Sequence, residues 1–302
     1  MDTHFLETFI AVVERGSLAE AAQKLNLTPA AVAQRIRALE AELGTPLLAR
    51  SGRVMKPTQA GFSILERVRR LVSDVKDLQA FAMSDTVSGE MRLGAINTAL
   101  TGLVPDILQQ LTQDYPSIEI FIKPGASMDL YTEVLDGGLD AAFIIEPKFE
   151  MRKTLRFEPL RREPLVLIAP RQMEGADPLE LLRTEPFIRY DRNQWGGHIA
   201  ETYLHDKGIV PIERYELDAL EAIAVMVDRG LGISIVPDWP PPWPAGLDLC
   251  KFPLPGSSAL RTIGVLAIRS SPRIKLIDAL LKVSKKTLGS NPPSGTPKVS
   301  LL

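Results

Sequence analysis

Apolar residues recur every three or four positions along the first 43 residues, a spacing typical of amphipathic helices. One face of the first predicted helix carries Phe5, Leu6, Phe9, Ile10 and Val13. This helix ends at Gly16, and Ser17 then offers an N-cap to a short Ala-rich helix that runs through Leu25, with Glu20 as its capping-box partner.

A second tight turn at Asn26 and Leu27 leads into the next predicted helix. Thr28 is an N-cap, and Pro29 sits at the first helical position, where its missing N–H costs nothing. The apolar face of this helix consists of Val32, Ile36, Leu39 and Leu43, and Gly44 ends it. Two helices joined by a tight turn, the second with a polar outer face, predict a helix-turn-helix.

Residues 46–50 and 54–56 are expected to pair as a small hairpin, or wing, around Ser51 and Gly52. Residues 58–83 then predict one long helix without proline. Its apolar positions follow heptad-like steps, with Gln79 interrupting the seam: Leu65, Val68, Val72, Val75 and Ala82. The stripe either packs on its own domain or pairs with a second copy of the helix. We favour pairing, because little else lies nearby to cover so long a helix.

After a small, polar segment at 84–89, the pattern changes to alternating strands and helices. Strands are expected at 91–95, 118–122 and 141–145, with helices at 99–113 and 128–136. This βαβαβ order indicates a parallel sheet covered by helices. A second α/β lobe is expected from strands at 165–169, 187–190 and 232–236, and helices after Pro178, at 195–206 and at 218–228. A strand at 261–268 and a helix at 272–287 complete the pattern, and residues 289–302 are expected to be a disordered tail.

Composition fits a folded chain of more than one domain, with 302 residues of which 45% are hydrophobic and 24% charged. Cys250 is the only cysteine, so an internal disulfide and a Cys-based zinc site are excluded, and we expect neither a metal nor a cofactor. Since no leader and no apolar run of about 18 residues is present, a cytoplasmic protein without membrane association is expected.

Charge becomes informative only when it is divided by region, because the formal net charge is just −2. Residues 1–83 hold 11 Lys and Arg against 9 Asp and Glu. Five cations cluster in a stretch opposed only by Glu40 and Glu42: Arg35, Arg37, Arg50, Arg53 and Lys56. A local basic surface is therefore expected beside the helix-turn-helix.

Residues 1–61 resemble the LysR-type transcriptional regulators. The resemblance is carried by Phe5-Leu6, Phe9, Gly16-Ser17-Leu18-Ala19-Glu20-Ala21-Ala22, Leu25-Asn26-Leu27-Thr28, Ala31-Val32, Ile36, Leu39-Glu40, Leu43-Gly44, Pro46-Leu47-Leu48, Arg50, Arg53 and Thr58-Gln59-Ala60-Gly61. A looser resemblance extends to about residue 286 through Arg92-Leu93-Gly94, Pro105, Tyr115-Pro116, Gly125, Gly137-Gly138-Leu139-Asp140 and residues 230–237.

This resemblance implies an α/β protein with an N-terminal winged helix-turn-helix at 1–61 and a linker and dimerisation helix with its hinge at 58–88. It also implies a two-lobed α/β effector domain at 89–288, similar to periplasmic binding proteins. The first lobe would comprise about 89–161 and 266–288, the second about 162–265. The implied partners are double-stranded promoter DNA, a small-molecule effector and further copies of the chain, as a homodimer or homotetramer.

At the DNA end, the resemblance implies base or phosphate contacts from Thr28, Pro29, Ala30, Ala33 and Gln34, and a minor-groove contact from Arg53. Arg35, Arg37 and Arg50 are candidates for phosphate contact, although Arg35 and Arg37 could equally form a solvated face paired with Glu40 or Glu42. Pro29 and Ala33 stand where the family often has Gln and Ser, which leaves Gln34 as the best direct reader of a base.

At the effector end, Asn97, Thr98 and Ala99 are expected to open a helix whose free N–H groups and hydroxyl suit a carboxylate, unless Thr98 is only an N-cap. Similar reasoning, together with the resemblance, assigns further contacts to Ser127, Met128, Ile144, Ile145, Arg189, Trp195 and Pro237. Ile144 and Ile145 would form an apolar wall. Trp195 would close over a flat or hydrophobic ligand, or merely cover the lobe surface.

Two other functional classes were weighed against a DNA-binding regulator. An enzyme would need a catalytic motif, but His198 and His205 have no supporting acidic or Cys motif, and no Gly-x-Ser-x-Gly or phosphate-loop pattern occurs. A transport binding protein would share the two lobes but would need an export signal and no winged helix. The first 61 residues therefore favour a transcriptional regulator whose DNA binding responds to an effector, expected to be an organic acid.

Overall fold

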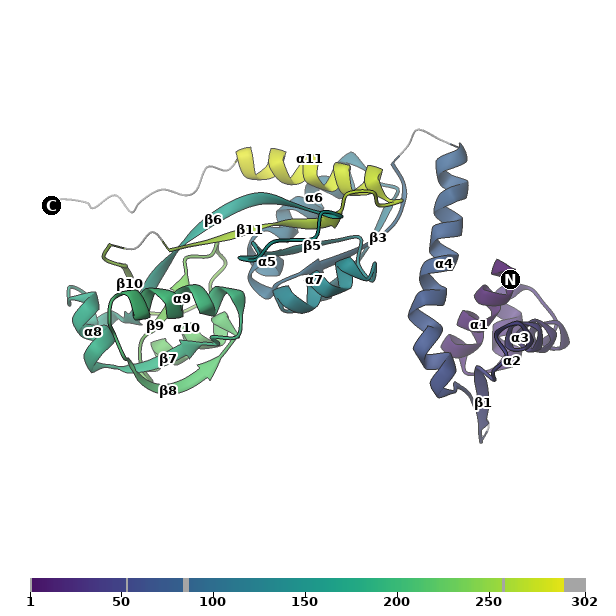
Figure 1. Ribbon diagram of the computed structural model, residues 1–302, viewed down its shortest axis with the longest axis horizontal. Coiled ribbons are helices and arrows are strands. Elements are labelled where there is room, and N and C mark those ends of the chain that lie inside the picture. The colour runs from purple at the N-terminus through teal and green to yellow at the C-terminus, as the bar shows by residue number, and fades with distance from the viewer. Residues whose placement is uncertain (1, 53, 84–86, 257–258, 291–302) are drawn as a thin grey trace. The chain divides into compact units, whose positions relative to one another are not determined.

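The computed structural model describes residues 2–52, 54–83, 87–256 and 259–290 (Figure 1). The chain divides into two compact units, Met1–Glu90 and Met91–Leu302. None of the helices in the described ranges is both long and apolar enough to cross a membrane.

The first unit is a winged helix-turn-helix followed by one long helix. Its elements are α1 (Thr3–Arg15), α2 (Leu18–Leu25), α3 (Pro29–Leu43), β1 (Leu48–Ser51), β2 (Val54–Pro57) and α4 (Gln59–Met83). The Ser17 hydroxyl accepts a hydrogen bond from the Glu20 N–H at 3.5 Å, and the Thr28 hydroxyl accepts one from the Ala31 N–H at 3.2 Å. Both N-caps predicted from the sequence are therefore present.

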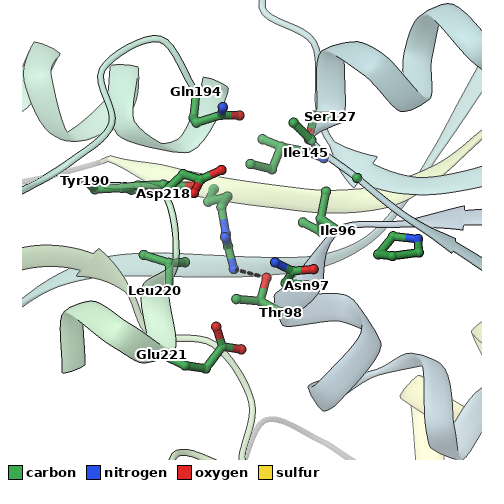
Figure 2. A pocket seen from close by; sticks show the side chains of 14 residues that line it. Ile96, Asn97, Thr98, Ser127, Ile145, Tyr190, Gln194, Asp218, Leu220 and Glu221 are labelled. Carbon is green, nitrogen blue, oxygen red and sulfur yellow. Dashed lines mark hydrogen bonds between the residues drawn. The ribbon is translucent and has the colours of Figure 1, made fainter. Parts of the chain in front are cut away.

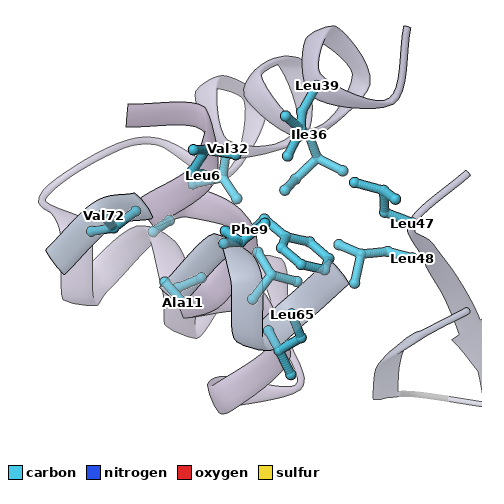
Figure 3. Packing of buried hydrophobic residues seen from close by; sticks show 14 residues of the cluster. Leu6, Phe9, Ala11, Val32, Ile36, Leu39, Leu47, Leu48, Leu65 and Val72 are labelled. Carbon is cyan, nitrogen blue, oxygen red and sulfur yellow. The ribbon is translucent and has the colours of Figure 1, made fainter. Parts of the chain in front are cut away.

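The apolar faces of these helices meet in one core (Figure 3). Its members include Leu6, Phe9, Val32, Ile36, Leu39, Leu47, Leu65, Val68 and Val72. Because Leu65, Val68 and Val72 of α4 are buried here, the favoured hypothesis that this part of the stripe pairs with another subunit is wrong. The helix lies against α1 and covers the core of its own unit. Val75 is half-buried, and the side chains of Gln79 and Ala82 lie outside the described residues.

Backbone contacts fix the wing to the helices on either side of it. The Met55 N–H donates to the Gly16 carbonyl at 2.7 Å, and the Thr58 N–H donates to the Leu47 carbonyl at 2.9 Å. A Cβ atom at Gly61 would lie 2.1 Å from the Leu47 carbonyl oxygen, so a larger residue at this position would push the first turn of α4 away from the wing.

The second unit consists of two α/β lobes. Its helices are α5 (Asn97–Gly102), α6 (Val104–Asp114), α7 (Ser127–Leu135), α8 (Pro178–Thr184), α9 (Trp195–Asp206), α10 (Leu220–Asp228) and α11 (Ile274–Ser290), with a 3-10 turn η1 at Arg171–Met173. Its strands are β3 (Gly89–Ala95), β4 (Ile118–Pro124), β5 (Ala141–Ile145), β6 (Leu155–Pro170), β7 (Pro186–Tyr190), β8 (Ile212–Leu217), β9 (Ser234–Pro237), β10 (Leu249–Pro253) and β11 (Leu260–Ile268).

Strands β6 and β11 connect the two lobes (Figure 1). In the first lobe the sheet order is β6-β11-β5-β3-β4, with β3 and β5 parallel and β11 antiparallel to β5 and β6. In the second lobe the later half of β6 pairs antiparallel with β9 and β10, and β7 and β8 form a parallel pair. Residues on β6 and β11 between the lobes are thus placed where the two lobes face each other.

Several elements differ from those expected. The single helix expected at 99–113 is two helices, α5 and α6, because Pro105 lies in the first turn of α6 and has no N–H to continue α5 into it. Strand β6 begins ten residues early, at Leu155, and β8 and β10 were not expected. All but one of the β8 side chains are exposed, so this strand shows no apolar alternation.

At the C-terminus, α11 continues through Gly289 and Ser290, so these two residues belong to a helix and not to the expected disordered tail. The rest of that expected tail, 291–302, lies outside the described residues.

Candidate functional site

The outer face of α3 is formed by the residues expected to approach DNA. Thr28, Pro29, Ala30, Gln34 and Arg37 are exposed, and Ala33 is half-buried. The opposite face of the same helix is buried in the core, so α3 has only one face available to a partner.

The positive charges of this surface differ in their freedom to bind phosphate. Arg35 is half-buried, and its Nη1 donates to the Thr8 hydroxyl at 3.4 Å. Glu40, one of its two expected carboxylate partners, instead accepts hydrogen bonds from the N–H groups of Leu47 at 2.7 Å and Leu48 at 3.1 Å. Arg37 is exposed and forms no hydrogen bond or ion pair with another described residue, which leaves its guanidinium available.

The wing carries the remaining predicted contacts. Strands β1 and β2 are paired with Ser51 opposite Val54, as expected for a short hairpin. Arg50 is exposed, and its Nε donates to the Gly52 carbonyl at 3.1 Å, a contact that steadies the wing loop. Arg53, the expected minor-groove contact, lies outside the described residues.

A cavity of about 310 Å³ lies between the two lobes of the second unit (Figure 2). It is lined by Ile96, Asn97, Thr98, Pro124, Gly125, Ala126, Ser127, Ile145, Tyr190, Gln194, Asp218, Leu220, Glu221 and Arg261. Four of the ten residues expected to contact an effector are among them: Asn97, Thr98, Ser127 and Ile145. The cavity therefore has the size of a small-molecule site, and both lobes contribute to it.

A buried arginine on β11 joins the lobes at this cavity. The Arg261 side chain is 1% exposed. Its Nε donates to Glu163 Oε2 on β6 at 2.8 Å, and its Nη2 donates to the Thr98 hydroxyl on α5 at 3.1 Å. Burial raises the pKa of the Glu163 carboxyl, and the charge of Arg261 opposes that rise. The pair keeps a guanidinium at the cavity wall with a compensating carboxylate behind it.

Glu163 faces a second guanidinium as well. Arg161 Nε lies 3.8 Å from Glu163 Oε1. Tyr190, which lines the cavity from the other lobe, also interacts with Arg261: burial raises the pKa of the Tyr190 hydroxyl, and the nearby charge of Arg261 opposes that rise. Two guanidinium groups therefore face the single carboxylate of Glu163.

The hydroxyl groups at the cavity have structural partners. Helix α5 is only six residues long, and the N–H groups of Ala99 and Leu100 both donate to the Ile96 carbonyl at 3.0 Å. The expected row of free N–H groups behind Thr98 is therefore not available there, and the Thr98 hydroxyl does not cap α5. The Ser127 hydroxyl accepts from the Ile145 N–H at 3.1 Å, which holds the start of α7 against the end of β5.

Six expected effector residues do not line this cavity. Ala99, Ile144 and Pro237 are buried inside their lobes, and Met128 is 50% exposed. Arg189 is buried in ion pairs with Glu201 and Glu213. Trp195 packs edge-on against Tyr131 and Phe149, with ring centroids 6.2 and 5.5 Å apart, and so bridges the lobes beside the cavity.

Sequence reasoning missed the charged residues of the cavity. Arg261 and Glu163 lie 98 residues apart, and their proximity follows only from the pairing of β6 with β11. A charge within the otherwise apolar strand pattern at 261–268 was the available signal for Arg261. For Asp218 and Glu221 the signal was their position at the start of the helix expected at 218–228.

Comparisons with known proteins agree with this geometry. Residues 3–62 match the model of the bacterial regulatory helix-turn-helix protein, lysR family, and residues 84–289 match the LysR substrate binding domain. The chain belongs to the LysR family of transcriptional regulators. The winged helix-turn-helix, linker helix and two-lobed effector domain predicted from the sequence are thereby confirmed.

Among the relatives of this chain, the HTH-type transcriptional regulator CzcR of Bacillus cereus is 33% identical over 238 residues, which cover 78% of this chain and 80% of that protein. TtuA of Agrobacterium vitis is 28% identical over 300 residues, covering 93% and 96%. The structure of full-length CbnR complexed with its target DNA has a TM-score of 0.66 at 21% identity, and the match covers 95% of this chain and 100% of that one.

Membership in the LysR family decides between the functional classes weighed from the sequence. The chain is a DNA-binding transcriptional regulator with an effector-binding domain, not an enzyme.

Proposed function

We propose that this LysR-family regulator binds promoter DNA in the cytoplasm as a homodimer or homotetramer, and that a small organic acid in the cavity between its lobes changes that binding. The observation that carries the effector assignment is Arg261, a guanidinium held at the cavity wall by contacts to both β6 and α5.

An anionic group suits this part of the cavity because of its charge and its free hydrogen-bond donors. Two guanidinium groups, of Arg161 and Arg261, share the single carboxylate of Glu163. The side chain of Asn97 forms no hydrogen bond with another described residue, so its amide N–H is available to a ligand oxygen. Apolar side chains of Ile96, Ile145 and Leu220 would cover the body of the ligand.

For assembly, we propose that α4 pairs with a second copy along an edge of the helix that the core leaves open. Leu71 is 46% exposed, and Val75, Leu78 and Ala82 follow it at steps of four, three and four residues. This spacing is typical of a coiled-coil seam. It runs beside the buried stripe of Leu65, Val68 and Val72, so one helix would serve both its own core and its partner.

On the DNA surface, Gln34→Ala and Arg37→Ala should have different effects. The Gln34 amide can read an adenine edge, so its loss should reduce discrimination at one base pair by about 1–3 kcal/mol. Arg37 forms no ion pair with another described residue, so its loss should weaken binding to every duplex. The slope of log affinity against log salt concentration should fall by about one, the value expected for one lost phosphate contact. Fluorescence anisotropy with the intergenic DNA beside the gene, at several salt concentrations, measures both effects.

Lys148→Ala is the matched control, because it removes one exposed positive charge from the second unit and should leave DNA binding unchanged. The same titrations with a random duplex test the proposed function itself. Equal affinity for the random duplex and the promoter at all salt concentrations would show that the protein is not a sequence-specific regulator.

A further inference from the structure

We infer that the effector is a zwitterion, namely an amino acid with an apolar side chain, whose carboxylate faces Arg261 and whose protonated amine faces Asp218 and Glu221. This inference rests on the proposed function, since it names the chemistry of the molecule that the cavity between the lobes would take.

The two carboxylates are the first observation. Asp218 and Glu221 both line the cavity from the second lobe, immediately before α10 and in its first turn. Neither side chain forms a hydrogen bond or ion pair with another residue in the described part of the chain. Figure 2 shows them on the side of the cavity opposite Asn97, Thr98 and Ser127.

Their lack of partners contrasts with the three carboxylates that gather around Arg189 and Arg192 in the same lobe. Glu201 and Glu213 bind Arg189, and Glu213 and Glu216 bind Arg192. Hydrogen bonds from Arg189 and Arg192 lower the pKa of the Glu213 carboxyl, and hydrogen bonds from Arg192 lower the pKa of the Glu216 carboxyl. Arginine therefore neutralises the carboxylates of Glu201, Glu213 and Glu216, whereas Asp218 and Glu221 face the cavity without such a partner.

A purely anionic ligand would meet these charges unfavourably. Its carboxylate would gain the contacts to Arg261, Thr98 and Asn97, but the rest of the molecule would lie against two carboxylates that form no ion pair with a described residue. A purely cationic ligand would meet the opposite difficulty at Arg261. A molecule with both groups would match both walls at once, and a few polar groups placed at the ends of a binding site generally set its specificity.

The space between the charged groups limits the size and polarity of the ligand's side chain. Part of the remaining lining is apolar, from Ile96, Pro124, Ala126, Ile145 and Leu220, and it lies beside the polar side chains of Tyr190 and Gln194. A cavity of about 310 Å³ has room for one small molecule. An amino acid whose side chain is aliphatic or aromatic fits this combination of size, charge and apolar surface.

Calorimetry on the full-length protein tests the inference with matched probes. The probes are L-leucine, L-isoleucine, L-valine, L-methionine and L-phenylalanine, each beside its N-acetyl derivative, which lacks the cation, and its amide, which lacks the anion. At least one parent amino acid should bind, and both of its derivatives should bind at least tenfold more weakly.

A variant test separates charge from shape. The double variant Asp218→Asn with Glu221→Gln keeps the shapes of both side chains. It should bind the parent amino acid at least tenfold more weakly than the wild type does. The ratio of affinities between the parent amino acid and its N-acetyl derivative should also become smaller. Glu180→Gln, on α8 of the same lobe and away from the cavity, should leave affinity unchanged. Circular dichroism should show that each variant melts near the wild-type temperature.

The outcomes distinguish this inference from the proposed function. If an N-acetyl acid binds as well as its parent and the double variant does not alter that binding, the effector is a simple acid, so the zwitterion is refuted while the regulator with an acid effector stands. If no amino acid binds, the zwitterion is likewise refuted. If the amides alone bind, both the zwitterion and the organic-acid assignment fail.

Discussion

Replacing Arg261 with methionine is expected to destabilise the second unit by about 3–5 kcal/mol and to abolish effector binding. The substitution leaves the Glu163 carboxylate fully buried with only the more distant Arg161 as a counter-charge. It also removes the donor to the Thr98 hydroxyl. Urea unfolding followed by circular dichroism measures the loss of stability, and calorimetry measures the loss of binding.

The double variant Arg261→Met with Glu163→Met is the control for this prediction. It removes both buried charges, so most of the lost stability should return, while effector binding should remain absent because the guanidinium is still missing. If Arg261→Met unfolds at the same urea concentration as the wild type, the loss of Arg261 does not leave a costly unpaired carboxylate at Glu163, which contradicts this account.

Replacing Val72 with aspartate is expected to unfold the first unit and so to abolish DNA binding. Val72 is 7% exposed and packs in the core formed by α1, α3, the wing and α4. An unpaired carboxylate there belongs to the most destabilising class of substitution, with an expected cost of more than about 4 kcal/mol. Limited proteolysis and thermal melting of the variant measure this loss directly.

The neighbouring substitution Leu71→Asp separates folding from assembly. Leu71 is 46% exposed and lies on the proposed pairing edge, so this variant should keep a folded first unit but sediment as a smaller species and bind DNA weakly. If Leu71→Asp sediments as the wild type does, the pairing edge is elsewhere. If Val72→Asp stays folded and only dissociates, the stripe on α4 belongs to the subunit interface after all.

The local signals of the first unit were sufficient to predict its fold. Ser17 and Thr28 cap helices through contacts within three residues, and the apolar steps of α3 specify its buried face without reference to distant elements. The role of the α4 stripe was not predictable in this way. Heptad-like spacing describes a face that must be covered, but the identity of the covering surface, here α1, depends on how the chain turns after the wing.

The cavity between the lobes was only partly predictable for a related reason. Thr98 and Ser127 begin helices directly after strands of the first lobe, where a parallel sheet gathers its ligand contacts. Arg261 and Glu163 come from strands that pass between the lobes, and Asp218 and Glu221 come from the second lobe. Their convergence depends on the pairing of β6 with β11, which no local pattern encodes.

The most direct test of the account is the reciprocal coupling between its two sites. The affinity of the protein for its effector is measured by calorimetry without DNA and then with saturating promoter DNA, and the affinity for DNA is measured with and without effector. If the cavity regulates DNA binding, both affinities must change, and by the same factor. An effector that binds with equal affinity to free and DNA-bound protein would contradict the account.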